Sequence, residues 1–140
     1  MKKTKIMIFG TFDVLHLGHI HFFKQARKLA KNPYLIVSIA RDTNVIRIKK
    51  VKPYHSERDR KALIEELKIV DKVIFGDKNN YLKHIITEKP DIIALGYDQF
   101  TYTEKLEEDL LKNKLKTKIK RLKQFKPNIY KSSKIKSHLS

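Results

Sequence analysis

Short clusters of apolar residues alternate along the chain with segments in which apolar residues recur at helical spacing. The clusters occupy residues 5–9, 34–40, 72–75 and 91–95 and are rich in Ile, Val, Leu and Phe. Apolar runs of this length are typical of strands that are buried on both faces of a parallel sheet. We therefore predict four buried strands at these positions.

Between the clusters, apolar residues repeat every three or four positions, as they do along one face of a helix. Four such repeats occur, at Phe22, Phe23, Ala26, Leu29 and Ala30; Leu63, Ile64, Leu67 and Val70; Leu82, Ile85 and Ile86; and Leu106, Leu110 and Leu111. Ser56, Asn80 and Thr103 are predicted N-caps, and Pro90 is expected to end the third helix. Residues 41–54 have no clear period, and we expect an irregular loop there.

A fifth strand is predicted within residues 115–122, where Leu115, Thr117 and Ile119 alternate with lysines. A row of lysines on one face suits the exposed edge of a sheet. Strict alternation of strands and helices favours parallel strands joined by right-handed crossover helices. We therefore predict one α/β domain over residues 1–140, a doubly wound five-stranded parallel sheet with helices on both faces.

The composition narrows the class of protein further. Lys and Arg number 32 against 15 Asp and Glu, a net charge of +17 that suits a nucleic acid, an anionic membrane surface or a phosphorylated substrate. The chain has no cysteine, which excludes disulfides, thiolate catalysis and cysteine-ligated metal centres and favours a cytoplasmic location. No apolar run is long enough to cross a membrane as a helix, so we expect no membrane segment.

The positive charge is concentrated in residues 112–136, which contain eleven basic residues and no acidic one. The chain has 26 lysines and only 6 arginines, and this segment has few aromatic residues. Specific nucleic-acid binding favours arginine for bidentate contacts and aromatic rings for stacking on bases. We therefore expect a solvated basic surface and no specific nucleic-acid partner.

The segment after the first predicted strand, residues 10–19, reads GTFDVLHLGH. It is neither the GxGxxG fingerprint nor a P-loop, because it has only two glycines and no Gly-Lys pair. Gly10 permits a tight turn, and Gly18 allows a ligand to approach the start of the next helix, where backbone amides favour phosphate. His16 and His19 flank that point, and their N–H groups can stabilise charge on a phosphoryl group.

Three closely spaced histidines, His16, His19 and His21, also raise the question of a metal site. No cysteine is available, and His19 and His21 point to different sides of a helix, so ligation of a transition metal is disfavoured. His21 is expected to be structural.

The pattern Gly10-Thr11-Phe12-Asp13 followed by His16-x-Gly18-His19 resembles the signature of the cytidylyltransferase-like nucleotidyltransferases, a superfamily with the HIGH-type motif. Residues 40–42, 54–60 and 70–74 also resemble members of this family, so the similarity covers nearly the whole chain. Residues 90–99, PDIIALGYDQ, are most similar to the archaeal-type FAD synthase branch. The resemblance implies a Rossmann-like fold and transfer of AMP from ATP to FMN, giving FAD and pyrophosphate.

The resemblance also implies roles for individual residues. The expected catalytic residues are His16, His19 and Arg60. The expected ATP-binding residues are Thr11, Phe12, His16, Leu17, Gly18, His19, Asp98, Lys126, Ser132 and Ser133. Residues expected around the acceptor and its phosphate are Asp13, Lys49 and Lys52. Tyr97 and Phe100 are expected to supply an aromatic wall for the flavin ring.

Mg²⁺ is expected to bridge the oxygens of ATP with no direct protein ligand, Asp13 approaching it only indirectly. The family resemblance also implies a homodimer. Two other functions stay open at this point. The first is CTP-dependent transfer to glycerol 3-phosphate or another small phosphorylated alcohol. The second is nucleic-acid binding, suggested by the charge and by residues 131–134, KSSK, which are similar to the KMSKS loop of aminoacyl-tRNA synthetases.

Overall fold

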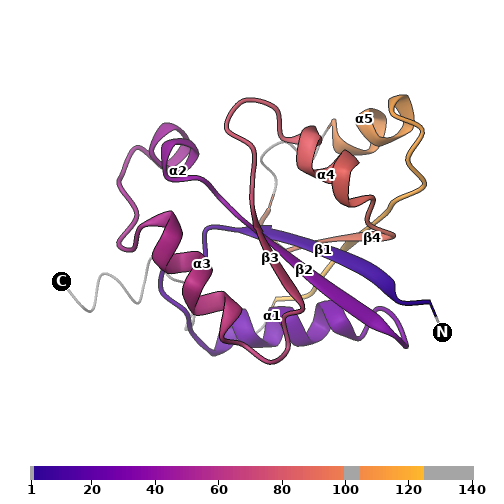
Figure 1. Cartoon of the computed structure of the whole chain (residues 1–140), viewed down its shortest axis with the longest axis horizontal. Helices are drawn as coiled ribbons and strands as arrows, with labels where there is room; N and C mark the ends of the chain where they lie inside the picture. Colours follow the sequence, from indigo (N-terminus) through magenta and orange to yellow (C-terminus); the bar gives the residue numbers. More distant parts are fainter. Residues whose placement is uncertain (1, 100–104, 125–140) are drawn as a thin grey trace.

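The computed structural model describes residues 2–99 and 105–124, which form a five-stranded parallel sheet between two layers of helices (Figure 1). The strands are β1 Thr4–Gly10, β2 Pro33–Ile39, β3 Lys72–Phe75, β4 Ile92–Leu95 and β5 Lys118–Arg121. The helices are α1 Leu17–Arg27, α2 Asp42–Lys49, α3 Glu57–Glu65, α4 Leu82–Glu88 and α5 Leu106–Lys112. The predicted doubly wound α/β fold is confirmed.

The strands lie in the order β3-β2-β1-β4-β5, so the chain starts in the centre of the sheet and winds outward on each side in turn. β1 pairs with β2 along its full length, whereas its pairing with β4 is limited to Ile6 and Met7. The carboxyl ends of β1 and β4 therefore separate. In doubly wound sheets such a switch point in strand order forms the crevice that binds ligands.

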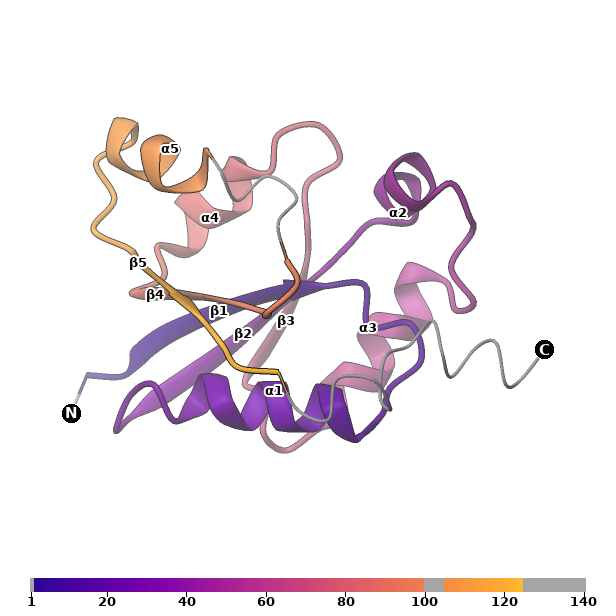
Figure 2. The ribbon, with the colours of Figure 1, turned by 180° about the vertical axis from the view of Figure 1, so that it is seen from behind.

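Alternate residues of the central strand supply two separate hydrophobic cores. Ile6 and Ile8 pack in the core beneath α1 and α3, together with Phe23 and Ile64. Met7 packs in the smaller core against α4 and α5 on the opposite face. Figure 2 shows α1 on one side of the sheet and α4 and α5 on the other. Burial on both faces explains why the strands are apolar throughout and do not alternate with polar residues.

The segment predicted to be an irregular loop contains α2, and that part of the prediction is wrong. Only Val45 of this helix is buried, so the sequence lacks the apolar stripe by which helices are recognised. The cap at Ser56 is confirmed, because its side chain accepts a hydrogen bond from the backbone N–H of Asp59. Asn80 lies one residue before the N-cap of α4. Thr103 lies outside the described residues.

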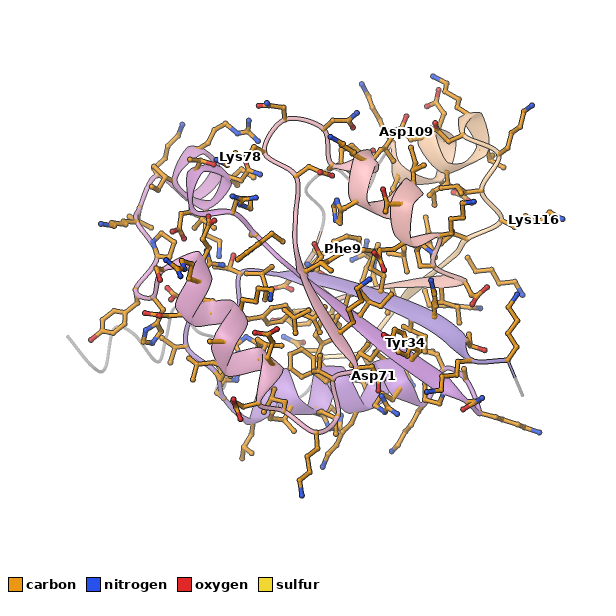
Figure 3. All side chains as sticks on the ribbon, in the orientation of Figure 1. Phe9, Tyr34, Asp71, Lys78, Asp109 and Lys116 are labelled. Atoms are coloured by element: carbon orange, nitrogen blue, oxygen red, sulfur yellow. The ribbon has the colours of Figure 1, made fainter. Side chains whose placement is uncertain are left out.

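The lysines of the last strand lie on the surface, as predicted for an edge strand. Leu115, Thr117 and Ile119 are half-buried, and the three lysines that alternate with them are exposed. Figure 3 shows the side chain of Lys116 pointing outward, whereas Phe9 lies near the middle of the molecule. Among the helices of residues 2–99 and 105–124, none is long and apolar enough to cross a membrane.

Candidate active site

The turn between β1 and α1 holds two histidines in a reciprocal capping arrangement. His16 is the N-cap of α1, and its Nδ1 accepts a hydrogen bond of 3.0 Å from the backbone N–H of Gly18. The Nδ1 atom of His19 accepts one of 3.3 Å from the backbone N–H of His16. Because both Nδ1 atoms are acceptors, each neutral ring carries its proton on Nε2. The turn therefore combines two Nε2–H donors with the backbone amides at the start of a helix.

Both histidines are neutral near pH 7. Burial, the neighbouring His16 and the charge of Lys49 lower the pKa of His19 to about 3. Burial also lowers the pKa of His16. Two neutral donors, with ring centroids 3.9 Å apart, can stabilise charge that develops on a phosphoryl oxygen without repelling each other as two cations would.

The buried side chain of Phe12 packs against this turn from the side of the core. Its φ of 50° lies in the left-handed region, and its ring lies against Gly10, where an added Cβ would come within 2.5 Å of the ring. The ring meets those of His19 and Phe23 edge-on, with distances between ring centroids of 5.5 Å and 5.2 Å. Phe12 is only 6% exposed, so its side chain belongs to the core and positions His19. The predicted contact between Phe12 and ATP stays a prediction.

Arg60, predicted as a catalytic residue, is completely buried. Its guanidinium donates to the carbonyl oxygen of Thr11 at 2.9 Å, to that of His55 at 3.1 Å and to Oδ1 of Asp42 at 2.6 Å. The structure therefore gives Arg60 a structural part, in which it ties the turn after β1 to α2 and α3. Its predicted catalytic role stays a prediction.

Asp13 lies beside this network and is 3% exposed. Its two carboxylate oxygens accept hydrogen bonds from the backbone N–H groups of Tyr54 and His55, at 2.5 and 2.7 Å. Asp13 therefore fixes the loop that precedes α3, and its predicted place near the acceptor stays a prediction. Within the described part of the chain, no three His, Asp or Glu side chains gather to hold a metal ion.

Several predicted binding residues do meet at the carboxyl end of β1. Nζ of Lys49 donates to Oγ1 of Thr11 at 3.3 Å, and the positive charge of Lys49 contributes to the lowered pKa of His19. Leu17, the first residue of α1, is 61% exposed beside the motif. Lys52 is exposed in the loop after α2. Lys49, which was predicted in a loop, is the last residue of α2.

The turn after β4 is held by Gln99, which the sequence analysis did not single out. Its side-chain oxygen accepts from the backbone N–H of Gly96, and its amide donates to the carbonyl oxygen of Phe9, both at 2.8 Å. Gln99 thus bridges the gap where β1 and β4 separate. Asp98 is exposed on this turn, as its predicted contact with nucleotide requires. The remaining predicted residues, Lys126, Ser132, Ser133 and Phe100, lie outside the described residues.

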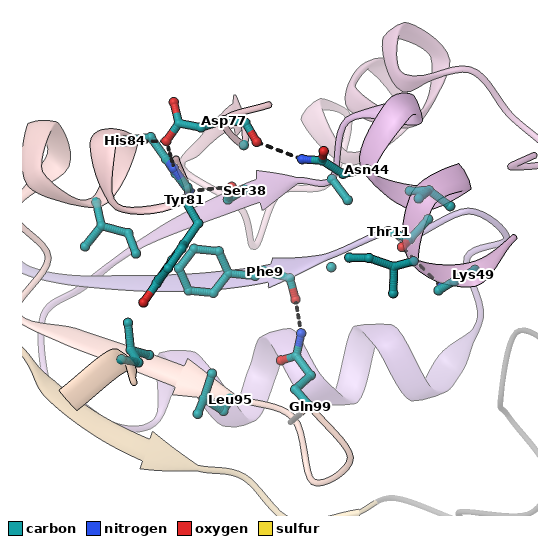
Figure 4. A pocket seen from close by; sticks show the side chains of 17 residues that line it. Phe9, Thr11, Ser38, Asn44, Lys49, Asp77, Tyr81, His84, Leu95 and Gln99 are labelled. Atoms are coloured by element: carbon teal, nitrogen blue, oxygen red, sulfur yellow. Dashed lines mark hydrogen bonds and ion pairs between the residues drawn. The ribbon is translucent and has the colours of Figure 1, made fainter. Parts of the chain in front are cut away.

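A cavity of about 270 Å³ lies between the carboxyl ends of the strands and α2 and α4 (Figure 4). Its apolar lining residues are Phe9, Val45, Ile48, Tyr81, Ile85, Leu95 and Leu106. Its polar lining residues are Thr11, Ser38, Asn44, Lys49, Asp77, His84 and Gln99. Thr11 and Lys49 connect it to the histidine turn, and Gln99 connects it to the turn after β4. Among the residues that the structure describes, Phe9 and Tyr81 supply the phenyl and phenol rings of this lining, and Tyr97 does not line it.

Comparison with known proteins agrees with this geometry. A family model described as cytidylyltransferase-like matches residues 7–138. A protein of Archaeoglobus profundus named FAD synthase is 46% identical over 120 residues, covering 86% of this chain and 75% of that protein. A Thermoplasma volcanium protein of the same name is 38% identical over 135 residues, covering 96% of this chain and 93% of that protein.

A crystal structure described as the lipopolysaccharide core biosynthesis protein from Thermoplasma volcanium GSS1 has a TM-score of 0.81 and 40% identity. The match covers 89% of this chain and 99% of that chain. Fold, histidine turn and family model thus lead to one assignment. The chain belongs to the cytidylyltransferase-like family.

Proposed function

We propose that this chain is an FAD synthase, which transfers AMP from ATP to FMN and releases pyrophosphate. The observation that carries the proposal is the position of an apolar, aromatic-lined cavity directly beside a phosphate-binding turn with two neutral histidines. The relatives named FAD synthase support flavin and adenylate as the two groups that are joined.

The triphosphate of ATP binds at the N-terminus of α1 in this proposal. Backbone amides and the helix dipole favour negative charge there, and Gly18 leaves room for a close approach. The Nε2–H groups of His16 and His19 donate to the phosphoryl oxygens. Asp98 and the turn after β4 face the nucleoside, and Lys126, Ser132 and Ser133 remain proposed contacts.

The acceptor FMN occupies the cavity. Its ring system lies between the apolar side chains, where Phe9 and Tyr81 offer aromatic surface. Its phosphate lies near Lys49 and Thr11, which join the cavity to the histidine turn. This orientation brings the FMN phosphate next to the α-phosphate of ATP, and Lys49 offsets the repulsion between the two anions.

The reaction then needs no nucleophile from the protein. An oxygen of the FMN phosphate forms a bond to the α-phosphorus of ATP, and the bond from that phosphorus to the bridging oxygen breaks, so that pyrophosphate leaves. Catalysis of such a step is chiefly positioning and neutralisation of charge. Mg²⁺ bound to the nucleotide oxygens supplies further neutralisation, and the side chains around the turn offer hydrogen-bond donors and a lysine rather than a carboxylate cage.

A substrate panel tests the proposal. ATP and CTP are each combined with FMN, riboflavin, glycerol 3-phosphate and a sugar phosphate in the presence of Mg²⁺, and products are separated by chromatography. We expect FAD from ATP and FMN, a clear preference for ATP over CTP, and no product from riboflavin. CDP-glycerol formed from CTP, with no FAD, would replace the proposal with the cytidylyltransferase alternative. A nucleotide-linked sugar would agree instead with the description of the Thermoplasma structure.

We also propose that the enzyme acts as a homodimer in the cytoplasm, as the family resemblance and the absence of cysteine suggested. Light scattering during gel filtration measures the molar mass in solution and so tests the homodimer. The basic segment is proposed to bind no specific nucleic acid, because it is rich in lysine and poor in arginine and aromatic residues. Binding to unrelated duplex DNA should therefore vanish as the salt concentration rises.

A further inference from the structure

A chain of hydrogen bonds runs from an acidic residue to a hydroxyl at the wall of the cavity. Nδ1 of His84 lies 2.6 Å from Oδ2 of Asp77, which also accepts the backbone N–H of His84 at 2.8 Å. Nε2 of His84 lies 3.0 Å from Oγ of Ser38. The three residues come from the loop after β3, from α4 and from β2, and Figure 4 shows them gathered on one side of the cavity.

The order of these groups fixes the direction of each hydrogen bond. An ionised carboxylate only accepts, so the proton between Asp77 and His84 lies on Nδ1. In the neutral form of the ring, Nε2 is then an acceptor, and the hydroxyl hydrogen of Ser38 points at it. The lone pairs of Ser38 Oγ are left as acceptors. Asp77 therefore determines, through His84, that this wall offers an acceptor and not a donor.

The polarity of the cavity is unevenly distributed. Ser38, His84 and Asp77 lie on one side in Figure 4, Phe9 lies in the middle, and Leu95 lies on the opposite side next to Gln99. The side-chain amide of Gln99 is already bonded to the backbone. The ring of Phe9 meets that of His84 edge-on at 5.8 Å, which fixes the imidazole from the apolar side. A ligand that fits this cavity needs a ring system with one apolar edge and one polar edge that carries an N–H.

We propose that Ser38 determines acceptor specificity by accepting a hydrogen bond from the ring N–H of the flavin, and that His84 and Asp77 are the positioning residues that make Ser38 an acceptor. This inference rests on the proposed function. The uracil-like edge of the flavin carries a single N–H, at N3, between two carbonyl groups, and its other edge carries two methyl groups. A site built to pair with an N–H discriminates against an analogue that lacks it.

The same three residue types form the nucleophilic triad of hydrolases, and the geometry here favours recognition over attack. Ser38 is 2% exposed. The neighbouring N–H of Gly76 donates to the carbonyl oxygen of Ile39 at 2.8 Å, so this amide is already used and does not stabilise an oxyanion. The hydroxyl at this wall is therefore suited to bind a ligand.

The test compares FMN with N3-methyl-FMN in the wild type and in Ser38→Ala, with kcat and KM measured for each. We expect the wild type to favour FMN, and Ser38→Ala to raise the KM for FMN about tenfold while reducing the preference over N3-methyl-FMN, a change typical of one lost hydrogen bond. An FMN analogue altered at the dimethylbenzene edge is the matched ligand control, whose discrimination should stay unchanged. The KM for ATP should also stay unchanged.

Two further variants separate recognition from a general structural defect. Asp77→Ala removes the acceptor that fixes the proton on Nδ1, so the ring can carry its proton on Nε2 and donate to Ser38. The Ser38 hydrogen can then turn towards the ligand, which should also weaken the preference for N3–H. Thr87→Ala removes an exposed hydroxyl from α4, the helix that carries His84. It is the matched protein control and should behave as the wild type. An equal loss with all flavins, accompanied by a lower melting temperature, would overturn the inference.

Failure of the inference is distinguishable from failure of the proposed function. If the wild type makes FAD and Ser38→Ala keeps the full preference for FMN, the inference is wrong and the function stands. If the wild type makes no FAD, the proposed function is wrong, and fluorescence titration of riboflavin and N3-methylriboflavin then tests the cavity directly. Equal affinity for both flavins, or no binding, would overturn the inference as well.

Discussion

Two groups of polar side chains lie together at the carboxyl end of β1 and use their hydrogen bonds differently. The group beneath the turn contains Arg60 and Asp13, which are buried and bonded to the backbone of two separate segments, the turn after β1 and the loop before α3. The group in the turn contains His16 and His19, which use Nδ1 for the backbone and keep a proton on Nε2. The first group holds the loops in place, and the second is suited to substrate.

The comparison shows that residue type does not identify a catalytic residue in this protein. Arg60 has the charge that a phosphate needs, but its guanidinium is buried and donates to Thr11, His55 and Asp42 of the protein itself. His19 carries no charge near neutral pH, because burial lowers its pKa to about 3, yet it sits at the start of a helix. Loss of the buried group should therefore affect stability, and loss of the turn should affect turnover.

The largest effect is expected from Arg60→Leu. The substitution removes the arginine donor from Oδ1 of Asp42 and from two carbonyl oxygens. Because Arg60 is buried but Asp42 is partly exposed, we expect a loss of about 3 kcal/mol of unfolding free energy, the lower end of the range for a broken buried ion pair. Urea unfolding measures it, and Arg58→Leu, at an exposed position of the same helix, is the control and should change stability little. A fully stable Arg60→Leu protein that has lost turnover would return Arg60 to the catalytic group.

The next effect is expected from His19→Ala in the turn. Loss of one preorganised donor typically lowers turnover by about 100-fold or more, and the variant should remain folded. His21→Ala, two residues further along the same helix, is the matched control and should retain most of the activity. Turnover is compared at saturating ATP and FMN. Equal losses in both folded variants would remove the distinction between His19 and His21.

The sequence predicted the turn well because its chemistry is local. His16, Gly18 and His19 lie within four residues at a strand-to-helix junction, so their spacing alone brings them together. The strands were also predictable, since burial on both faces makes them continuously apolar. In contrast, α2 has one buried residue and therefore left no periodic signal.

The cavity was not predictable, because it depends on contacts between distant segments. Ser38, Asp77 and His84 meet only because β3 lies next to β2 and α4 returns across the sheet. The spacing of these residues in the sequence does not predict that they lie in contact. The burial and the backbone partners of Arg60 and Asp13 were not predictable for a related reason, since they are properties of the folded chain.

A smaller effect on the free energy of unfolding is expected from a change in pH. The folded pKa of His19 is about 3, below the ordinary value of 6.5, so the unfolded chain binds more protons between these values. The free energy of unfolding should therefore fall as pH drops below 6.5, by about 1 kcal/mol over the first pH unit. His19→Gln should lack this component, and His21→Gln should retain it. Urea unfolding at a series of pH values measures the slope, and an identical slope in both variants would contradict the assignment.

The smallest effect on activity is expected from Lys49→Met. This variant tests whether Lys49, beside the histidine turn, binds the phosphate of the acceptor. Lys49 is exposed, and a solvent-exposed ion pair contributes about 1 kcal/mol or less, so the KM for FMN should rise roughly fivefold with a smaller change in kcat. Added salt should narrow the difference from the wild type, because exposed charges are screened. Lys52→Met is the matched control. Nζ of Lys49 reaches Thr11 at the cavity, whereas Lys52 lies in the loop beyond α2, so a larger effect at Lys52 would place the acceptor phosphate at that loop.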